Sequence, residues 1–151
     1  MSNDTSTDTS TDAGSDGGTS FAEVAEGVRA AIATYTQALD DGRTDDVVAT
    51  FTPDAVCDLG PMGRFEGQDA LRAAYAGWAP RGPQRHLVLN TLVTAHGGDE
   101  AEAVSDVVFI APGKAGWAIH LVGRYRDVLH RDPDGGSWRF HRRVATFEKA
   151  G

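Results

Sequence analysis

The sequence predicts an α+β fold in which three helices come first and a curved, mostly antiparallel sheet follows. Apolar residues recur at helical spacing as far as about residue 79. After that, four β-like runs are separated by the turn-like stretches HGGDE, PGKAG and DPDGG. Helices followed by a meander are typical of α+β domains, and helices packed across one face of such a sheet would enclose a hydrophobic pocket.

The first helix is the most clearly marked element. Ser20 and Glu23 match a capping box, in which each residue's side chain satisfies a backbone N–H of the other. Apolar residues then recur from Phe21 to Leu39, and Gly42 suits the end of a helix. We therefore expect a long amphipathic helix directly before the acidic pair in LDDG.

The elements between this helix and the sheet are shorter. A second helix is expected from about 45 to 51, with Thr44 as its cap, followed by a turn at TPDA and a short strand at AVCDL. GPMGRFEG is expected to form a Gly-rich loop, and QDALRAAYAGWA a third helix. The four strands of the sheet are expected at about Gln84–Ala95, Ala101–Ala111, Trp117–His130 and Ser137–Lys149.

Composition divides the chain into a tail and one domain. Residues 1–20 are almost entirely Asp, Ser, Thr and Gly, so we expect a disordered acidic tail, and one domain at 21–151. The net charge of -8 and pI of about 4.9 argue against nucleic acid and anionic membrane surfaces as partners. No basic-then-apolar leader is seen, and Cys57 is the single cysteine, so a cytoplasmic setting is expected.

Motifs for several familiar chemistries are missing from the sequence. It contains no GxxxxGK[S/T], GxGxxG or GxSxG stretch, and no two histidines at the helical spacing of metal ligands. We therefore expect neither a cofactor nor a metal. The remaining possibilities are acid–base chemistry in an apolar pocket, or binding alone.

The stretch RHLVLN places two polar residues in an otherwise apolar strand. In a regular strand His86, Val88, Asn90 and Leu92 share one face. A buried polar group without a partner costs roughly 1–3 kcal/mol, so His86 and Asn90 are either satisfied structural residues or line a cavity. In a cavity they could grip a carbonyl or hydroxyl oxygen, and His86 could transfer a proton near neutral pH.

Other polar residues allow a functional and a structural interpretation. Asp40 ends the first helix, where an acid opposes the helix dipole, so it either belongs to a polar turn or turns inward to orient a histidine. Tyr35 lies on the apolar face of that helix and needs a partner for its hydroxyl. Asp58 is a surface turn residue or a base at a pocket rim. Asp106 is a pocket acid, faces outward, or pairs with an arginine of a neighbouring strand.

Positive charge gathers in the last two strands. His141 alternates with Arg139 and Arg143, and this face is expected on the solvent side or at a subunit interface. The charges of Arg124, Arg126, Arg142 and Arg143 could bind an acidic substrate, but pairing with the many aspartates is expected. Apolar pocket lining is expected from Phe51, Met62, Phe65, Tyr75 and Trp78.

Three stretches of the chain resemble the SnoaL-like family of the nuclear-transport-factor-two-like superfamily. They are YTQALDDGRTDDVVATFTPDAVCDLGPMGRFEGQDAL, RHLVLN and VGRYRDVLHRDPDGGSWRFHRR, within about residues 22–147. The resemblance implies a cone-shaped α+β domain with a deep hydrophobic pocket. It leaves the activity open, because the superfamily includes isomerases, cyclases, dehydratases, epoxide hydrolases and non-enzymes. It also implies a homodimer formed through the outer face of the sheet.

Individual residues can be matched to branches of that superfamily. Asp40 and His86 stand where scytalone dehydratase has its aspartate–histidine pair. Tyr35 is similar to the first-helix tyrosine of ketosteroid isomerases, while Asp58 and Asp106 lie near the positions of their two aspartates. The Asp-Arg-Asp set of limonene-type epoxide hydrolases is not reproduced, because valine and phenylalanine stand at two of its positions.

The leading hypothesis is a cofactor-independent lyase or isomerase acting on a small apolar cyclic ketone or hydroxy compound. His86 would be the general acid/base, oriented by Asp40, while Tyr35 and Asn90 would bind a substrate oxygen. One alternative is a non-catalytic binding module for a hydrophobic metabolite. Another is an assembly role of the sheet's outer face, to which Trp117 and Trp138 could contribute.

Overall fold

A computed structural model describes residues 18–149, so the tail predicted for residues 1–20 lies almost entirely outside the described residues. Its helices are α1 (Phe21–Asp40), α2 (Thr44–Ala49) and α3 (Gly67–Gly77), with a short 3₁₀ turn, η1 (Gly60–Met62). Its strands are β1 (Phe51–Asp58), β2 (Arg64–Glu66), β3 (Arg85–Gly97), β4 (Glu100–Gly113), β5 (Gly116–Arg131) and β6 (Trp138–Lys149). None of the helices described is long and apolar enough to cross a membrane.

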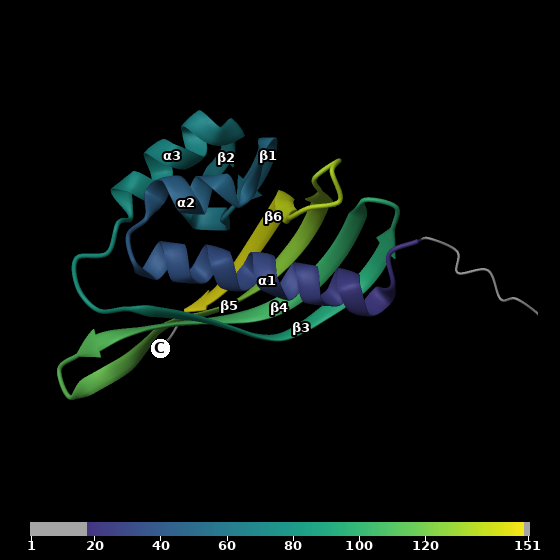
Figure 1. The fold of residues 1–151 in the computed structure, drawn as a ribbon. Helices are drawn as coiled ribbons and strands as arrows, with labels where there is room; N and C mark the ends of the chain where they lie inside the picture. Colours follow the sequence, from purple (N-terminus) through teal and green to yellow (C-terminus); the bar gives the residue numbers. More distant parts are fainter. Residues whose placement is uncertain (1–17, 150–151) are drawn as a thin grey trace, which may run out of the picture.

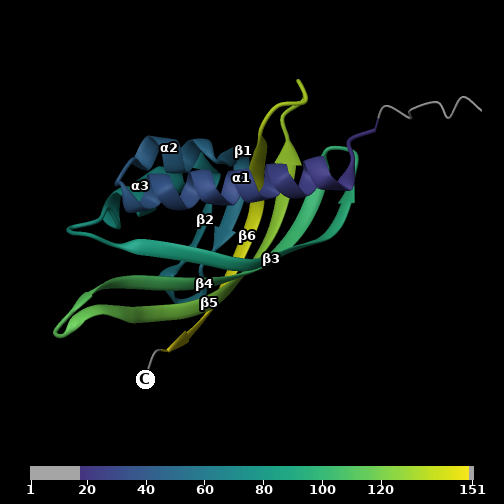
Figure 2. The same cartoon turned by 60° about the horizontal axis from the view of Figure 1, so that its bottom comes forward.

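The six strands form one open sheet in the order β2-β1-β6-β5-β4-β3. All neighbouring strands are antiparallel except β1 and β6, which run parallel. The sheet curves around the helices, which all lie on its inner face (Figures 1 and 2). α1 packs against β3, while α3 packs against β1. The α+β class and the curved, mostly antiparallel sheet are therefore confirmed.

The predicted start of α1 is confirmed in detail. Ser20 accepts a hydrogen bond from the backbone of Glu23, and the Glu23 carboxylate accepts one from the backbone of Ser20. The helix ends at Asp40, and Gly42 adopts a φ of 71° in the left-handed region that glycine tolerates best. Along α1 the apolar face from Val24 to Leu39 is buried.

The short helix α2 ends earlier than expected, and the strand after it begins earlier. Phe51 was expected at the end of the helix and 52–55 in a turn, but β1 already begins at Phe51. The parallel partner of Phe51 is Phe140, and both side chains are fully buried. A register shift between Phe51 and Val56 absorbs Pro53, which cannot donate to a strand ladder. Burial of two aromatic rings thus outweighs the local turn signal of TPDA.

Trp138 lies in the core and not on the outer face. It is 7% exposed, and a side chain added to Gly27 of α1 would stand 2.3 Å from the indole ring. The glycine therefore allows α1 to approach the start of β6. Trp117 is 56% exposed. Of the two tryptophans considered for an assembly surface, only Trp117 is accessible to a partner.

Two irregularities decide which side chains face the helices. In β3 the register shifts between Leu89 and Leu92, and Asn90 adopts a φ of 54°. The register of β5 and β6 shifts next to His141, so that Phe140 and Arg143 both point inward. The expected alternation is therefore wrong beyond each irregularity, because a single extra residue exchanges the two faces of a strand.

Candidate active site

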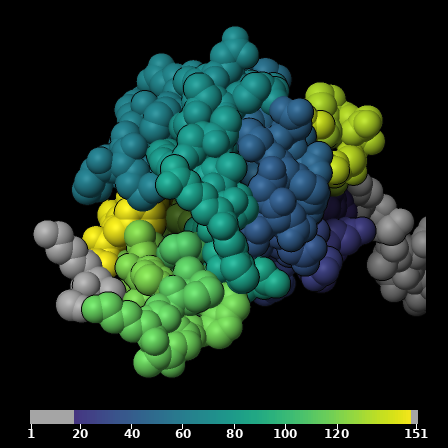
Figure 3. All heavy atoms as spheres, turned by 90° about the vertical axis from the view of Figure 1, so that its left-hand side faces the viewer, coloured from purple at the N-terminus to yellow at the C-terminus, as the bar shows by residue number. Residues whose placement is uncertain are grey.

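A cavity of about 420 Å³ lies between the helices and the inner face of the sheet. It is lined by residues of α1, the segment from Leu59 through η1, α3, the loop after α3 and strands β3 to β6: Tyr35, Leu39, Leu59, Met62, Tyr75, Gly77, Trp78, Ala79, Pro80, Arg81, Gln84, His86, Phe109, Leu121, Tyr125 and Phe147. Figure 3 views the end of the molecule where the loop after α3 lies above the β4–β5 hairpin. The size of this cavity and its largely apolar lining are typical of sites for small organic ligands.

The structure brings Asp40 and His86 together at this cavity, although they lie 46 positions apart in the chain. The distance between His86 Nδ1 and Asp40 Oδ1 is 2.7 Å, and the backbone N–H of His86 donates to Asp40 Oδ2 at 2.8 Å. Gln84 Nε2 donates to the same carboxylate at 3.2 Å. The last turn of α1 and the start of β3 are thus joined through one carboxylate.

These contacts determine which nitrogen of His86 carries a proton when the ring is neutral. Burial raises the pKa of Asp40, but the hydrogen bonds from His86 and Gln84 outweigh that effect and hold the pKa below its usual value. The carboxylate is therefore ionised at neutral pH and can only accept hydrogen bonds. His86 must donate through Nδ1, which leaves the Nε2 lone pair available to a ligand as a base.

Three tyrosines of the lining, Tyr35, Tyr75 and Tyr125, form what we call the tyrosine wall. The hydroxyls of Tyr35 and Tyr75 are hydrogen-bonded at 2.9 Å, and the Tyr75 hydroxyl lies 4.0 Å from Cys57 Sγ. Burial raises the pKa of all three tyrosines, so their hydroxyls stay neutral. The bond between Tyr35 and Tyr75 uses the proton of one of them, which leaves the other proton of that pair and the Tyr125 hydroxyl to donate to a ligand oxygen. Burial also raises the pKa of Cys57 to about 11, which leaves it a protonated thiol.

Gln84, Phe109 and Tyr125 are among the lining residues that sequence reasoning missed. Gln84 stands two residues before His86 and so shares its face of the chain, a signal that was available. Phe109 stacks on His86 with ring centroids 4.6 Å apart. Tyr125 is only 4% exposed. Phe109 and Tyr125 lie in ordinary apolar strand patterns, so nothing in the sequence separates them from core residues.

Of the predicted apolar lining residues, Met62, Tyr75 and Trp78 do line the cavity. Phe51 is fully buried in the core behind Tyr35, with ring centroids 5.9 Å apart. Phe65 packs on the outside of Trp78 at 5.5 Å and is not part of the lining. Both assignments to the cavity were therefore wrong, because each ring lies behind another aromatic ring that faces the cavity.

Asp58, the predicted rim residue, ends β1 outside the lining. Its carboxylate accepts a hydrogen bond from the backbone N–H of Gly60 at 3.0 Å, which stabilises the turn into η1. The structure thus gives Asp58 the turn role that was its alternative interpretation.

Asn90 and Asp106 lie on the outer face of the sheet, away from the cavity. Asn90 Nδ2 donates to Asp106 Oδ2 at 2.9 Å, and Arg124 Nε and Nη2 donate to Asp106 Oδ1 at 2.9 and 2.7 Å. Their expected place in the substrate pocket was wrong for a physical reason. The irregularity at Asn90 turns this side chain outward, and Asp106 alternates with the buried residues Ser105 and Val107.

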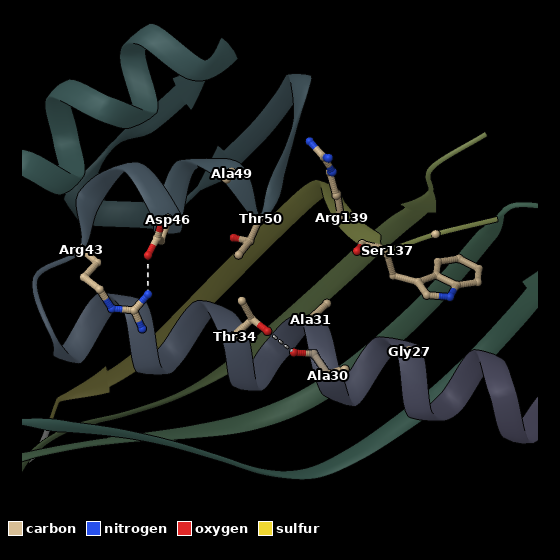
Figure 4. A pocket seen from close by; sticks show the side chains of 12 residues that line it. Gly27, Ala30, Ala31, Thr34, Arg43, Asp46, Ala49, Thr50, Ser137 and Arg139 are labelled. Carbon is tan, nitrogen blue, oxygen red and sulfur yellow. Dashed lines mark hydrogen bonds and ion pairs between the residues drawn. The ribbon is translucent and has the colours of Figure 1, made fainter. Parts of the chain in front are cut away.

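A second hollow of about 380 Å³ lies between α1, α2 and the start of β6 (Figure 4). Most of its polar side chains already have partners within the protein. Arg43 pairs with Asp46, Thr34 Oγ1 donates to the Ala30 carbonyl oxygen at 2.8 Å, and Arg139 pairs with Asp132. Within residues 18–149 no group of three His, Cys, Asp or Glu side chains could hold a metal ion. The cavity beside His86 is therefore the stronger candidate site.

An open curved sheet wrapped by three helices around an apolar cavity defines the nuclear-transport-factor-two-like class of α+β domains, also described as cystatin-like. Within that class the chain belongs to the SnoaL-like domain family, whose model matches residues 21–144. The expected family is thus confirmed. No curated protein sequence matches the chain significantly.

Solved structures share the fold over most of the chain. A Mycobacterium tuberculosis protein of unknown function is 26% identical over 82% of this chain and 70% of its own, with a TM-score of 0.74. A Novosphingobium aromaticivorans protein provisionally named a scytalone dehydratase is 23% identical over 82% and 83%, with a TM-score of 0.70. A Catenulispora acidiphila protein in complex with S-DNPA is 22% identical over 83% and 94%, with a TM-score of 0.73. At these identities the likenesses establish the fold.

Proposed function

We propose that this protein is a cofactor-independent acid–base enzyme of the dehydratase, isomerase or cyclase type. Its substrate would be a small apolar cyclic ketone or hydroxy compound bound in the cavity. The observation that carries the proposal is the Asp40–His86 pair, in which His86 lines the cavity and its Nδ1 is bound to the carboxylate at 2.7 Å. This arrangement fixes the ring and directs its basic nitrogen to a ligand.

In the proposed reaction His86 Nε2 removes a proton from the carbon next to a carbonyl group. In a dehydration the substrate's hydroxyl leaves from the neighbouring carbon and takes up a proton from His86 to form water. In an isomerisation the proton returns to a different carbon. Asp40 stabilises the imidazolium that forms between the two proton transfers, and tyrosine hydroxyls donate hydrogen bonds to the carbonyl oxygen.

The cavity volume limits the size of the substrate. A cavity of 150 Å³ accommodates benzene, which corresponds to roughly 25 Å³ for each carbon atom. On that scale the 420 Å³ cavity takes about 17 non-hydrogen atoms, the size of a compound with two or three fused rings. The proposal of a cyclic substrate rests on this volume and on the aromatic rings in the lining.

Proton abstraction can be tested without knowing the natural substrate. We expect the protein to speed exchange of the protons next to the carbonyl of 2-tetralone, a two-ring ketone, with deuterium from D₂O, as followed by NMR. His86→Ala should slow the catalysed exchange by about 10²–10⁴-fold, because that is the usual contribution of a general acid–base residue. Asp106→Ala, on the outer face, is the matched control and should exchange like the wild type. Equal rates in the wild type and His86→Ala would sink the proposal.

A second candidate function is a non-catalytic binding module for a hydrophobic metabolite. The apolar lining favours it, because the same cavity would bind such a ligand whether or not His86 transfers a proton. In that case the Asp40–His86 pair only joins α1 to β3. A ligand that co-purifies with the protein and is recovered unchanged after long incubation would support binding alone. Conversion of that ligand in a time course would support the enzyme.

A further inference from the structure

A buried ion pair lies directly behind the tyrosine wall. Arg143 of β6 and Asp127 of β5 are cross-strand partners, and both side chains are 0% exposed. Arg143 Nε and Nη2 donate to the two oxygens of Asp127, each at 2.8 Å. Burying such a pair is expensive, and hydrophobic residues of similar volume often replace one without loss of stability. Its place beside the cavity calls for a reason other than stability.

The guanidinium group is enclosed by aromatic rings that reach the cavity. Its central carbon, Cζ, lies 3.9 Å from the ring centroid of Tyr125 and 4.5 Å from that of Tyr35. Both tyrosines line the cavity. A cation over the face of a phenol draws electron density from the ring and makes its hydroxyl a stronger donor. Consistent with this, the Arg143 charge acts to lower the pKa of both tyrosines, against the larger effect of burial and, for Tyr125, against the smaller opposite effect of Asp127.

One donor of Arg143 has no partner. Nη1 is the single buried polar side-chain atom within residues 18–149 that makes no hydrogen bond. Because Asp127 takes Nε and Nη2, Nη1 lies on the side of the guanidinium away from most of the carboxylate charge. The pair is neutral as a whole, but its positive part is stacked against Tyr35 and Tyr125. A buried charged donor without a hydrogen-bond partner lowers the stability of the folded state. Its presence beside the two tyrosines is explained if its positive charge acts on a ligand in the cavity.

We propose that Arg143, held by Asp127, is a positioning residue that makes the tyrosine wall selective for a ligand oxygen that carries or gains negative charge. The inference rests on the proposed function in taking the cavity as the ligand site, and it narrows the substrate class. The carbonyl oxygen of an enolisable ketone, or a phenolic oxygen, binds at the tyrosine wall. Arg143 does not touch the ligand and acts through the rings of Tyr35 and Tyr125.

The test uses 4-nitrophenol, whose ionised and neutral forms absorb at different wavelengths. The full-length protein is titrated with the probe at the pH where free 4-nitrophenol is half ionised, and the spectrum gives the ratio of bound phenolate to bound phenol. Working at one pH keeps the ratio of free phenolate to free phenol the same for every variant. We expect the wild type to bind mainly the phenolate.

Removing the ion pair should weaken this preference while the fold is retained. In Arg143→Met/Asp127→Leu the ratio of bound phenolate to phenol should fall about tenfold, the usual difference between hydrogen bonding to charged and neutral groups. Arg124→Met/Asp106→Leu removes the matching pair on the outer face and should leave the ratio unchanged. Circular dichroism checks the fold of each variant. If the first variant does not fold, Arg143→Gln/Asp127→Asn, which keeps polar contacts but no charge, decides in its place.

Each outcome has a distinct meaning. A wild-type protein that binds no 4-nitrophenol, or binds both forms alike, overturns the role of Arg143, as does an unchanged ratio in a folded inner-pair variant. Catalysed exchange of 2-tetralone without a phenolate preference would leave the acid–base proposal standing alone. A phenolate preference that depends on Arg143, without any exchange, would support the role of Arg143 and favour the binding module.

Discussion

The two faces of the sheet carry the same pair of residue types in two different settings. On the inner face Asp127 and Arg143 are cross-strand partners, and on the outer face Asp106 and Arg124 are as well. Both side chains of the inner pair are 0% exposed, whereas those of Asp106 and Arg124 are 30% and 52% exposed. The same two residue types therefore contribute differently to stability. Water screens the charges of the outer pair, whereas the protein core does not screen those of the inner pair.

The hydrogen-bond geometry of the two pairs differs in the same sense. Asp127 receives one donor of Arg143 on each oxygen, in a fork that satisfies the whole carboxylate. Asp106 receives both donors of Arg124 on one oxygen and leaves the other for Asn90. In the outer cluster water can replace any lost partner. In the inner pair nothing can, so the loss of one member leaves an uncompensated charge.

The largest expected effect comes from breaking the inner pair on one side only. Arg143→Met should lower the free energy of unfolding by about 3–5 kcal/mol, because Asp127 is left charged and buried without a partner. Arg124→Met should cost a small fraction of that. Urea denaturation followed by circular dichroism measures both. Similar losses in the two variants would contradict the distinction drawn from burial.

The next effect concerns Asp40, the carboxylate at the end of α1 that binds His86. Asp40→Asn should lower the free energy of unfolding by about 1.5–3 kcal/mol at pH 7, because the contacts with His86 and Gln84 are then made by a neutral group. The folded state lowers the pKa of Asp40 below its usual 3.8, so its ionised form stabilises the protein above that pH. This stabilisation is lost as the pH falls through the lowered pKa.

Denaturation of the wild type and Asp40→Asn over a series of pH values checks that expectation. The difference between the two proteins should shrink as the pH falls below the usual pKa of an aspartate and through the lowered pKa of Asp40. If the difference in the free energy of unfolding stayed constant into strong acid, the charge of Asp40 would not be what stabilises its contact with His86. The tautomer can be read independently from ¹⁵N shifts of His86, which should show a protonated Nδ1 in the neutral wild-type ring.

The sequence was sufficient for the parts of the molecule that depend on local pattern. The capping box at Ser20, the length of α1 and the order of the four long strands follow from residue spacing, and the structure confirms them. The suspected pairing of Asp40 with His86 came from a family resemblance. Spacing could not have shown it, because 46 residues separate the two and only the packing of α1 on β3 brings them together.

The failures at the site have one physical origin. Alternation assigns a face correctly only in a regular strand, and the irregularities at Asn90 in β3 and at His141 in β6 fall at residues on which the site assignment depends. Asn90 was expected inside and lies outside, whereas Arg143 was expected on the solvent side and is fully buried. The positive φ of Asn90 and the register shift near His141 have no clear signal in a single sequence. Register is a property of the assembled sheet and is fixed by the pairing of distant segments.

A further, small effect on stability tests that explanation at Asn90. Asn90→Ala should lower the free energy of unfolding by about 1 kcal/mol, because alanine tolerates the left-handed conformation at φ 54° less well than asparagine. Asn90→Gly also loses the hydrogen bond to Asp106 but keeps the backbone freedom, so it should be the more stable of the two variants. Both should bind 4-nitrophenol like the wild type. If instead Asn90→Ala kept full stability and weakened binding of the probe, Asn90 would point into the cavity, and the two faces of the sheet would not be separated at the irregularity in β3.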